Sequence, residues 1–381
     1  MNAVRPDEFP PGELALLPTR RVVWGSGSLD RLENLLDGLR AERVLVMTSR
    51  SLAQQGALLA RVRSQCGVLY AGHFAAVAAH VPQTAVENAA AAARAVRADT
   101  LVCFGGGSVI DAGKAVAARM AQESRRPPAK LIALPTTLSG AEFADHYGVT
   151  EAREGGSVKR THAREDVTPA AVVLDAELTT ATGQWLWAGS ALKALDHAIE
   201  GLMCSVARPV LDELAQAGIH QLVAALPTSL NPAALDARQA CQIAAWYCYF
   251  APASLTLGLS HRIGHVLGGT YGVPHAFTSG LTLPAVLAAT APTVPRRFDL
   301  VTQALEPVAM HFGDERRARD AGAVLSRLAD EAGLPTCLRD VEVARRDLKA
   351  IAEQVVTLYP EAIHQLNGSG LQLIDLLESI W

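Results

Sequence analysis

Four histidines of this chain lie in two short segments in which imidazole side chains could act together. His261 and His265 stand one helical turn apart, and His275 follows shortly after them. His197 ends the earlier segment 193–197, which reads Lys-Ala-Leu-Asp-His. Residues at positions i and i+4 share one face of a helix, where imidazoles bind metal ions or exchange protons near neutral pH. The pattern predicts either a metal site or a site of hydride-transfer chemistry.

Lys193 distinguishes between these two kinds of site. It precedes His197 by one helical turn, at a position where a carboxylate would complete a set of metal ligands. A protonated ammonium has no lone pair to donate, and removing its proton in a buried site costs several kcal/mol. We therefore expect a metal-free site that Lys193 faces, the alternative being a lysine on an exposed helix surface. Asp196 points about 100° away from His197 around the helix, so we expect it to be solvated or bridging rather than a ligand.

The composition limits the classes of function. The chain has 381 residues, 50% of them hydrophobic, which is enough for two domains with separate cores. A net charge of −4 offers no basic surface for nucleic acid. No apolar run is long enough to cross a bilayer, and residues 1–8 lack the residue order of a secretion signal. We expect a cytoplasmic protein that binds neither nucleic acid nor a membrane, with its six cysteines serving as buried small hydrophobes.

Strand and helix patterns alternate from about residue 20 to residue 175, which is typical of a parallel sheet with crossover helices. Strands are expected at 43–48, 68–70, 100–104, 130–134 and 172–175, and helices at 52–62, 84–96 and 109–120. Beyond that point the strand signals stop, and apolar helical segments follow, broken by prolines that include Pro227 and Pro284. The expected fold class is an α/β dinucleotide-binding domain at 1–177 with a Rossmann-like parallel sheet, followed by an all-α domain at 178–381 for the substrate or metal site.

A glycine-rich turn directly follows one of these strands and opens a helix. The turn consists of Gly105, Gly106, Gly107 and Ser108, and the helix after it contains Asp111 and Lys114. Glycines let a pyrophosphate approach the backbone, and a helix N-terminus supplies free N–H groups and partial positive charge. The turn does not follow the G-x-G-x-x-G fingerprint, so a tight turn without a ligand is the alternative to the predicted dinucleotide site.

Two further strand ends belong to the predicted cofactor site. Thr136 and Thr137 follow the strand at 130–134 and offer hydroxyl groups at the same sheet edge, where α/β sheets bind their ligands. Ser49 and Arg50 stand where an acidic residue would hold the ribose 2′-OH of NAD. This pair tolerates or favours NADP(H), although a solvated loop arginine explains it equally well. The expected cofactor is NAD(H) or NADP(H).

With these motifs in order, the chain resembles the iron-containing (group III) alcohol dehydrogenase superfamily from about residue 20 to residue 290. The matching segments are 23–27, 105–108 with Asp111 and Lys114, 135–137, 174–179, 197–200, His261, His265 and 274–275. Within the superfamily the segments 80–82, 136–142, 147–151 and 265–276 are most similar to the maleylacetate reductase branch. The resemblance implies the fold described above, including an active site between the two domains, and a homodimer that takes part in the degradation of aromatic compounds.

The resemblance also implies roles for single residues. The metal ligands of the family, an aspartate and three histidines, fall on Lys193, His197, His261 and His275, and a further active-site histidine falls on His265. The reductase branch tends to carry a neutral residue instead of the aspartate, which agrees with a metal-free site; iron or zinc on the three histidines is the alternative. Phe277 replaces an acid of the branch and Ser279 replaces a histidine, so we expect an altered substrate pocket that includes Phe277 and the vestigial ligands His197 and His275.

These features together predict an NAD(P)H-dependent, maleylacetate reductase-like oxidoreductase that transfers a hydride to an enone or carbonyl of a small carboxylate-bearing substrate. Such a reaction builds negative charge on oxygen and requires a proton. Lys193 is expected to provide the positive charge, and His261 and His265 are candidate proton donors. Three alternatives stay open: a metal-dependent alcohol dehydrogenase acting on aldehydes, a lyase resembling dehydroquinate synthase, and a dinucleotide-binding protein without activity.

Overall fold

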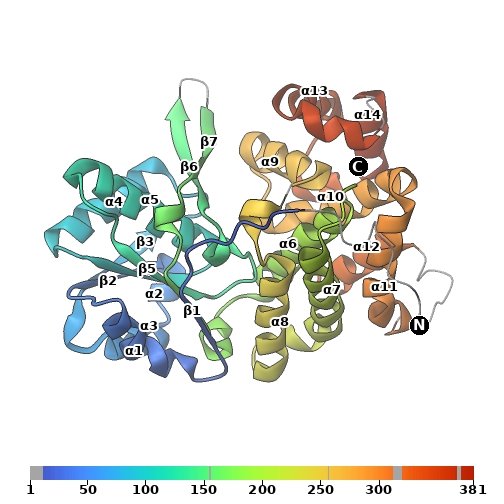
Figure 1. Cartoon of the computed structure of the whole chain (residues 1–381). Helices are drawn as coiled ribbons and strands as arrows, with labels where there is room; N and C mark the ends of the chain where they lie inside the picture. The colour runs from blue at the N-terminus through green and yellow to red at the C-terminus, as the bar shows by residue number, and fades with distance from the viewer. Residues whose placement is uncertain (1–11, 154–155, 256, 312–319, 367–369) are drawn as a thin grey trace.

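A computed structural model describes residues 12–153, 156–255, 257–311, 320–366 and 370–381 of the chain. Figure 1 shows an α/β half that contains the amino-terminal part of the chain and a helical half that contains the rest. The predicted fold class, a parallel-sheet α/β domain followed by an all-α domain, is therefore confirmed. The boundary placed between residues 177 and 178 stays a prediction. Residues 1–8, from which the absence of a secretion signal was expected, lie outside the described residues.

The α/β half is built on a six-stranded sheet in which every pair of neighbouring strands is parallel. In spatial order the strands are β1 (Arg21–Trp24), β8 (Ala171–Leu174), β5 (Lys130–Pro135), β4 (Thr100–Gly105), β2 (Val44–Ser49) and β3 (Tyr70–Val77). Alternate residues of a strand point to opposite faces, so Leu101 and Cys103 join one apolar core while Val102 and Phe104 join the other. This burial on both faces explains why the central strands are uninterrupted apolar runs in the sequence.

Helices cover both faces of the sheet, as the alternating pattern predicts. They are α1 (Leu32–Gly38), α2 (Arg50–Ala53), α3 (Gly56–Cys66), α4 (Gln83–Ala95) and α5 (Gly107–Ser124). In Figure 1, α4 and α5 lie on one side of the sheet and α1 and α3 on the other. The single helix expected at 52–62 is wrong, because two helices occupy this stretch. The first of them is capped by Ser49, whose hydroxyl accepts a hydrogen bond from the Leu52 N–H at 3.3 Å.

The direction of the chain across the sheet reverses between β2 and β4. From β2 the chain first moves to β3 at one edge, and then continues with β4, β5 and β8 on the other side of β2. At such a reversal the loops after the two adjacent strands separate and leave a crevice at their carboxyl ends, where α/β sheets bind ligands. The predicted Ser49 is the last residue of β2, and the glycine turn starts at Gly105, the last residue of β4, so both lie at this crevice.

A β-hairpin that sequence reasoning missed projects from the α/β half (Figure 1). It consists of β6 (His146–Arg153) and β7 (Gly156–Ala163), which pair antiparallel to each other and not with the main sheet. Its sequence is rich in charged and small residues and has no apolar run, so it lacks the usual signal of a buried strand.

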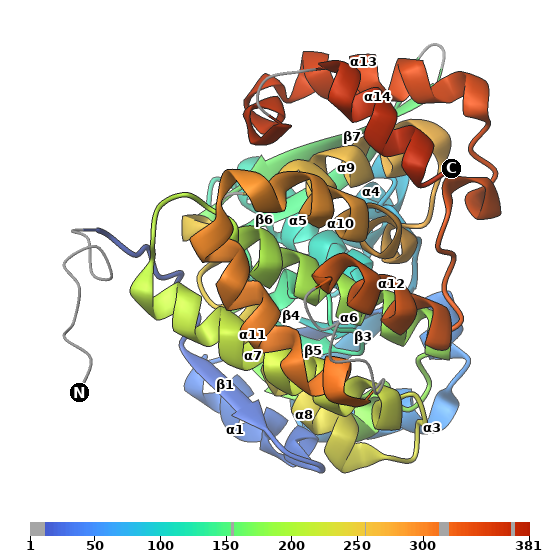
Figure 2. The same ribbon diagram turned by 90° about the vertical axis from the view of Figure 1, so that its right-hand side faces the viewer.

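The helical half contains no strand among its described residues, as expected. Its helices are α6 (Gln184–Leu202), α7 (Pro209–Ser229), α8 (Leu235–Cys248), α9 (Leu259–Tyr271), α10 (His275–Thr290), α11 (Pro295–His311), α12 (Ala321–Glu331), α13 (Leu348–Leu358) and α14 (Gly370–Ser379). Figure 2 shows α9, α10 and α12 packed around α6. Every residue of α6 from Trp187 onward is buried. The expected breaks at Pro227 and Pro284 are wrong, because both prolines lie inside helices.

The structure bears on two expectations from composition, which concern membrane-spanning segments and the cysteines. Within the described residues, no helix combines the length and apolar character needed to cross a membrane. All six cysteines are free, but Cys204 and Cys337 are only half-buried, so the expectation of six buried cysteines is correct for four of them. The predicted homodimer stays a prediction.

Candidate functional site

The glycine turn after β4 packs directly against the turn after β5. A Cβ on Gly106 would lie 2.9 Å from Cγ2 of Thr137, and a Cβ on Gly107 would lie 2.9 Å from Oγ of Ser139. Any larger residue would push the two turns apart, so glycine is required here by contact. The turn opens α5, whose N-cap Gly106 forms no side-chain cap hydrogen bond. The first N–H groups of this long helix are therefore available to an anion.

Two buried hydroxyl groups at this sheet edge have no hydrogen-bond partner in the structure. They are Oγ1 of Thr137, after β5, and Oγ1 of Thr48, at the end of β2. A buried polar atom without a partner costs free energy, and a bound ligand with hydroxyl and phosphate groups would provide the missing bonds. These residues therefore fit the ribose and phosphate groups of a nicotinamide dinucleotide. Thr136, also predicted here, is buried beside them, and its carbonyl accepts a hydrogen bond from Thr182.

The remaining residues of the predicted cofactor site lie nearby, but some of their polar groups already have partners. The ammonium of Lys114 is buried in α5 and donates to the carbonyl oxygens of Ala141 and His146. Asp111 accepts a hydrogen bond from the N–H of Gly148 at 3.2 Å. These two side chains attach the base of the β6–β7 hairpin to the helix that begins at the glycine turn. Ser108 is half-buried in the first turn of the same helix.

Gly106→Ala is expected to weaken the binding of NADH and NADPH by about 10- to 100-fold, because overpacking of this size typically costs about 1–3 kcal/mol. The added methyl group would meet Thr137 and separate the two turns. Fluorescence titration of either nucleotide measures the effect. Gly56→Ala is the matched control, since a Cβ there has nothing within 4 Å. Equal affinities for the two variants would contradict a dinucleotide site at this turn.

The predicted histidines come together between α6, α9 and α10. The ring centroids of His197 and His261 are 4.7 Å apart, and those of His265 and His275 are 6.1 Å apart. Burial holds the pKa of His197, His265 and His275 well below the usual value, and the positive charge of Lys193 lowers it further. These three imidazoles are therefore neutral near pH 7.

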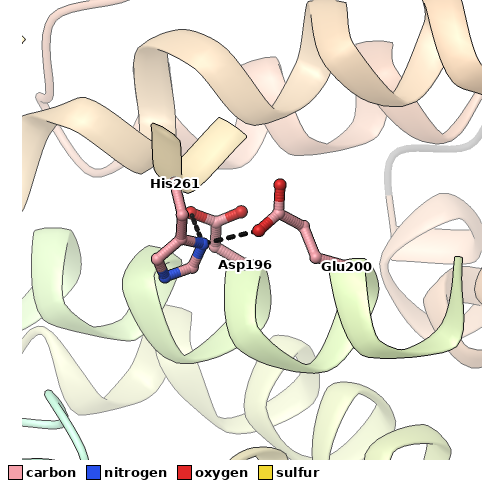
Figure 3. Close-up of side chains that lie close together, drawn as sticks. All are labelled: Asp196, Glu200 and His261. Carbon is pink, nitrogen blue, oxygen red and sulfur yellow. Dashed lines mark hydrogen bonds and ion pairs between the residues drawn. The ribbon is translucent and has the colours of Figure 1, made fainter. Parts of the chain in front are cut away.

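His261 differs from the other histidines because it faces two carboxylates, as Figure 3 shows. Its Nδ1 lies 2.7 Å from Oε2 of Glu200 and 3.1 Å from Oδ2 of Asp196. Burial opposes the charge on this imidazole, but the carboxylates outweigh it and raise the pKa of His261. Because Nδ1 of His261 is bonded to the carboxylates, a protonated ring has only its Nε2–H to donate to a further group. Nε2 has no hydrogen-bond partner among the described residues.

Glu200 also fixes the start of α9. Its two carboxylate oxygens accept hydrogen bonds from the N–H groups of Gly258 at 2.8 Å and Ser260 at 2.7 Å. A carboxylate at a helix N-terminus satisfies free N–H groups and interacts favourably with the helix dipole. The same residue therefore positions the helix that carries His261 and bonds the imidazole itself.

Lys193 is buried in α6, with only 7% of its surface exposed. Its Nζ lies 3.8 Å from Oδ2 of Asp196 and has no hydrogen-bond partner in the structure. Burial lowers the pKa of Lys193 to about 8, with Asp196 and Glu200 acting in the opposite direction. At that pKa the ammonium is mostly charged near pH 7. The alternative expectation, a lysine on an exposed helix surface, is therefore wrong.

Asp196 is bridging, which was one of the two expectations for it, and it is not solvated. It is fully buried, and its Oδ2 accepts a 2.6 Å hydrogen bond from the hydroxyl of Ser279 while it pairs with Lys193 and His261. The expectation of a solvated side chain fails because α6 is covered on all sides, so no direction around the helix leads to water.

The side chains of Asp196, Glu200 and His261 are already paired with one another and with backbone groups, so they do not form a free metal site. Asp196, Glu200 and His261 place one oxygen or nitrogen atom each within 4.8 Å of one another, a spacing that a cation also takes. However, both oxygens of Glu200 accept bonds from backbone N–H groups, and Nδ1 of His261 points at the carboxylates as a donor. The ammonium of Lys193 adds a positive charge beside them.

Several residues of this site were not assigned a role in it from sequence. Glu200 and Asp196 are charged residues in an otherwise apolar helix, and this could have indicated burial with partners. Ser279 gave no signal beyond its departure from the reductase branch. Tyr249, which stacks on His197 with ring centroids 4.0 Å apart, gave none. Phe277, predicted for the pocket, packs on Trp185 with centroids 5.6 Å apart.

Comparison with known proteins finds similarity along nearly the whole chain. Residues 18–176 match the family model of iron-containing alcohol dehydrogenase, and residues 187–376 match the model of the C-terminal part of the Fe-containing alcohol dehydrogenase family. Maleylacetate reductase of Pseudomonas sp. (strain P51) is 34% identical over 90% of this chain and 91% of its own length. Among crystal structures, maleylacetate reductase from Agrobacterium tumefaciens is similar with a TM-score of 0.83 and 29% identity, covering 98% of this chain and 99% of that one. A putative alcohol dehydrogenase from Ralstonia eutropha is similar with a TM-score of 0.86 and 33% identity, covering 98% of both chains.

Proposed function

Because the chain belongs to the iron-containing alcohol dehydrogenase family and is an oxidoreductase similar to maleylacetate reductases, we propose that it reduces maleylacetate or a closely related carboxylate-bearing enone with NADH or NADPH and without a metal ion. The observation that carries this proposal is the buried ammonium of Lys193 beside Asp196, at the position where the family resemblance implies a carboxylate ligand. Relatives named maleylacetate reductase support the substrate class.

The residues that would hold the nucleotide lie at the sheet edge. The N–H groups at the start of α5 and the unpartnered hydroxyls of Thr48 and Thr137 are suited to its phosphate and ribose groups. When bound, the dihydronicotinamide supplies the hydride. Arg50, exposed beside Ser49 at the end of β2, can accompany a 2′-phosphate and supports use of NADPH as well as NADH.

Lys193 and His261 have distinct roles in the proposed reaction. The Lys193 ammonium attracts a substrate carboxylate and stabilises negative charge that develops on the substrate oxygen. His261 donates the proton through Nε2, because Asp196 and Glu200 raise its pKa and favour the charged form. His265, the other candidate donor, is held neutral by burial and the charge of Lys193. We therefore assign His265 a binding role, with Nδ1 3.4 Å from the hydroxyl of Tyr359.

The proposal predicts that chelator-treated protein, shown to be metal-free by mass spectrometry, oxidises NADH or NADPH when maleylacetate is added. Added iron or zinc is expected to leave this rate unchanged, because Lys193 supplies the positive charge that a metal would otherwise give. The assay also includes simple aldehydes and 2-oxo acids.

Each alternative gives a different result in the same assay. If the protein shows no activity until iron or zinc is added and then turns over aldehydes, it is a metal-dependent alcohol dehydrogenase. A lyase of the dehydroquinate synthase kind would show no net consumption of NAD(P)H. Nucleotide binding without turnover of any substrate would indicate a protein without catalytic activity.

A further inference from the structure

Tyr249 lies between the two halves of the molecule and contacts both. It follows the last residue of α8, and its side chain is buried. One face of its ring stacks on His197, with centroids 4.0 Å apart and planes inclined by 18°. Its hydroxyl is 3.2 Å from Nε2 of His146, the first residue of the β6–β7 hairpin.

The ring of Tyr249 also packs against the turn after β5. A Cβ on Gly140 would lie 2.7 Å from Cδ1 of Tyr249, and Gly140 has a positive φ of 74° that favours glycine. This glycine belongs to the same turn as Thr137, which touches the glycine turn of the proposed cofactor site. Tyr249 therefore connects the cofactor-binding turns to the histidines.

The orientation of His197 depends on ring contacts. Its Nδ1 has no hydrogen-bond partner in the structure, and its ring is stacked on Tyr249 and on His261. No carboxylate is seen to hold it, in contrast to His261. Loss of the Tyr249 ring would leave a gap beside His197 and free the imidazole to rotate.

The partner of the Tyr249 hydroxyl is itself anchored to the α/β half. The carbonyl of His146 accepts a hydrogen bond from Lys114 of α5, and its Nδ1 lies 3.4 Å from Asp145. A second aromatic contact, between Phe143 and Trp246 with centroids 5.4 Å apart, joins the same two segments. The position of α8 relative to the cofactor-binding turns is thus set by side chains around Tyr249.

We propose that Tyr249 is a positioning residue for hydride transfer: it holds His197 and fixes the distance between the cofactor-binding turns and the histidine cluster. This inference rests on the proposed function, because it concerns the same reduction. Hydride transfer is sensitive to the separation of donor and acceptor, and a misplacement of about 1 Å can lower the rate by about 10²-fold.

The test compares three variants in the metal-free protein. Tyr249→Leu removes the stack on His197, and Tyr249→Phe removes only the hydroxyl. Phe250→Leu is the control, because the adjacent Phe250 ring makes a tilted contact with Trp246, with centroids 6.2 Å apart, and none with His197 is recorded among the described residues. For Tyr249→Leu we expect kcat to fall by about 10- to 100-fold, with little change in KM for the nucleotide. For Tyr249→Phe we expect a loss of about fivefold, typical of one neutral hydrogen bond.

The deuterium isotope effect with NADH or NADPH labelled at C4 separates positioning from general stability. It is expected to increase in both Tyr249 variants, because hydride transfer becomes more rate-limiting, and to stay at the wild-type value in Phe250→Leu. If wild-type protein is active and both Tyr249 variants match the control in kcat and isotope effect, the inference is wrong while the proposed function stands. If Tyr249→Leu does not fold, Tyr249→Phe, which keeps the ring, decides alone. Wild-type protein without any NAD(P)H oxidation would overturn the proposed function and this inference with it.

Discussion

Lys193→Met is expected to lower kcat/KM for maleylacetate by about 10²- to 10³-fold, the loss typical of removing one preorganised electrostatic group. Methionine keeps most of the length of the side chain but removes the charge that faces Asp196 and the histidines. Affinity for the nucleotide is expected to change little, because the cofactor-binding turns belong to the other half of the molecule. Steady-state kinetics with maleylacetate and a nucleotide titration measure the two quantities separately.

Two further variants, Lys349→Met and Lys193→Asp, show whether the loss in Lys193→Met comes from the charge at this position. Lys349→Met is the control, since the side chain of this lysine in α13 is 77% exposed and pairs with the exposed carboxylate of Glu353. Lys193→Asp places a carboxylate one turn before His197, so this variant is expected to bind zinc more tightly than the wild-type protein. An unchanged kcat/KM in Lys193→Met would refute the electrostatic role of the lysine.

Asp196→Asn is expected to reduce the free energy of unfolding by about 3 kcal/mol, because removing one partner of a buried ion pair leaves uncompensated charge. The substitution conserves shape while it removes the negative charge beside Lys193 and His261. Urea unfolding, compared with the exposed variant Asp299→Asn, measures the loss. A loss no larger than that of the control would show that Glu200 alone compensates the buried positive charges.

The double variant Lys193→Met, Asp196→Asn tests whether the two side chains act as a pair. Residues in contact usually deviate from additivity by about 0.5–3 kcal/mol. We expect the double variant to be more stable than the sum of the single losses predicts, because removing both charges leaves neither uncompensated.

The central strands β2, β4, β5 and β8 of the main sheet could be predicted from sequence because they are buried on both faces. Runs such as 100–104 therefore consist of apolar residues, and the glycines at 105–107 mark the turn that follows. The edge strands β1 and β3 are only partly buried, so β1 was missed and the strand expected at 68–70 is wrong, since β3 begins at Tyr70. The β6–β7 hairpin stands apart from this sheet and has no such run, so its sequence contains no comparable signal. What identifies a strand in the sequence is a continuous buried run, and in the described part of the hairpin only residues 147–149 are buried.

The candidate site was predicted in part for similar reasons. The spacing of His261 and His265 correctly indicated one helix, and Lys193 was expected to face the site, where the structure has it buried. The burial of Asp196 was missed, because its position around the helix does not reveal what covers that side. Tyr249 reaches His197 from a distant helix end, and only tertiary packing brings such residues together.

The burial of α6 has a consequence for how this enzyme can evolve. Lys193, Asp196, His197 and Glu200 lie on a helix with no exposed residue from Trp187 to Leu202. A substitution that alters the chemistry at any of these positions also alters the stability of the core, so it must be accompanied by compensating changes in neighbouring helices. The exposed residues 159–163 of β7 and the half-buried start of α10 are free of this constraint. New substrate preferences are therefore expected to arise there first, while the charged cluster on α6 changes only as a coordinated set.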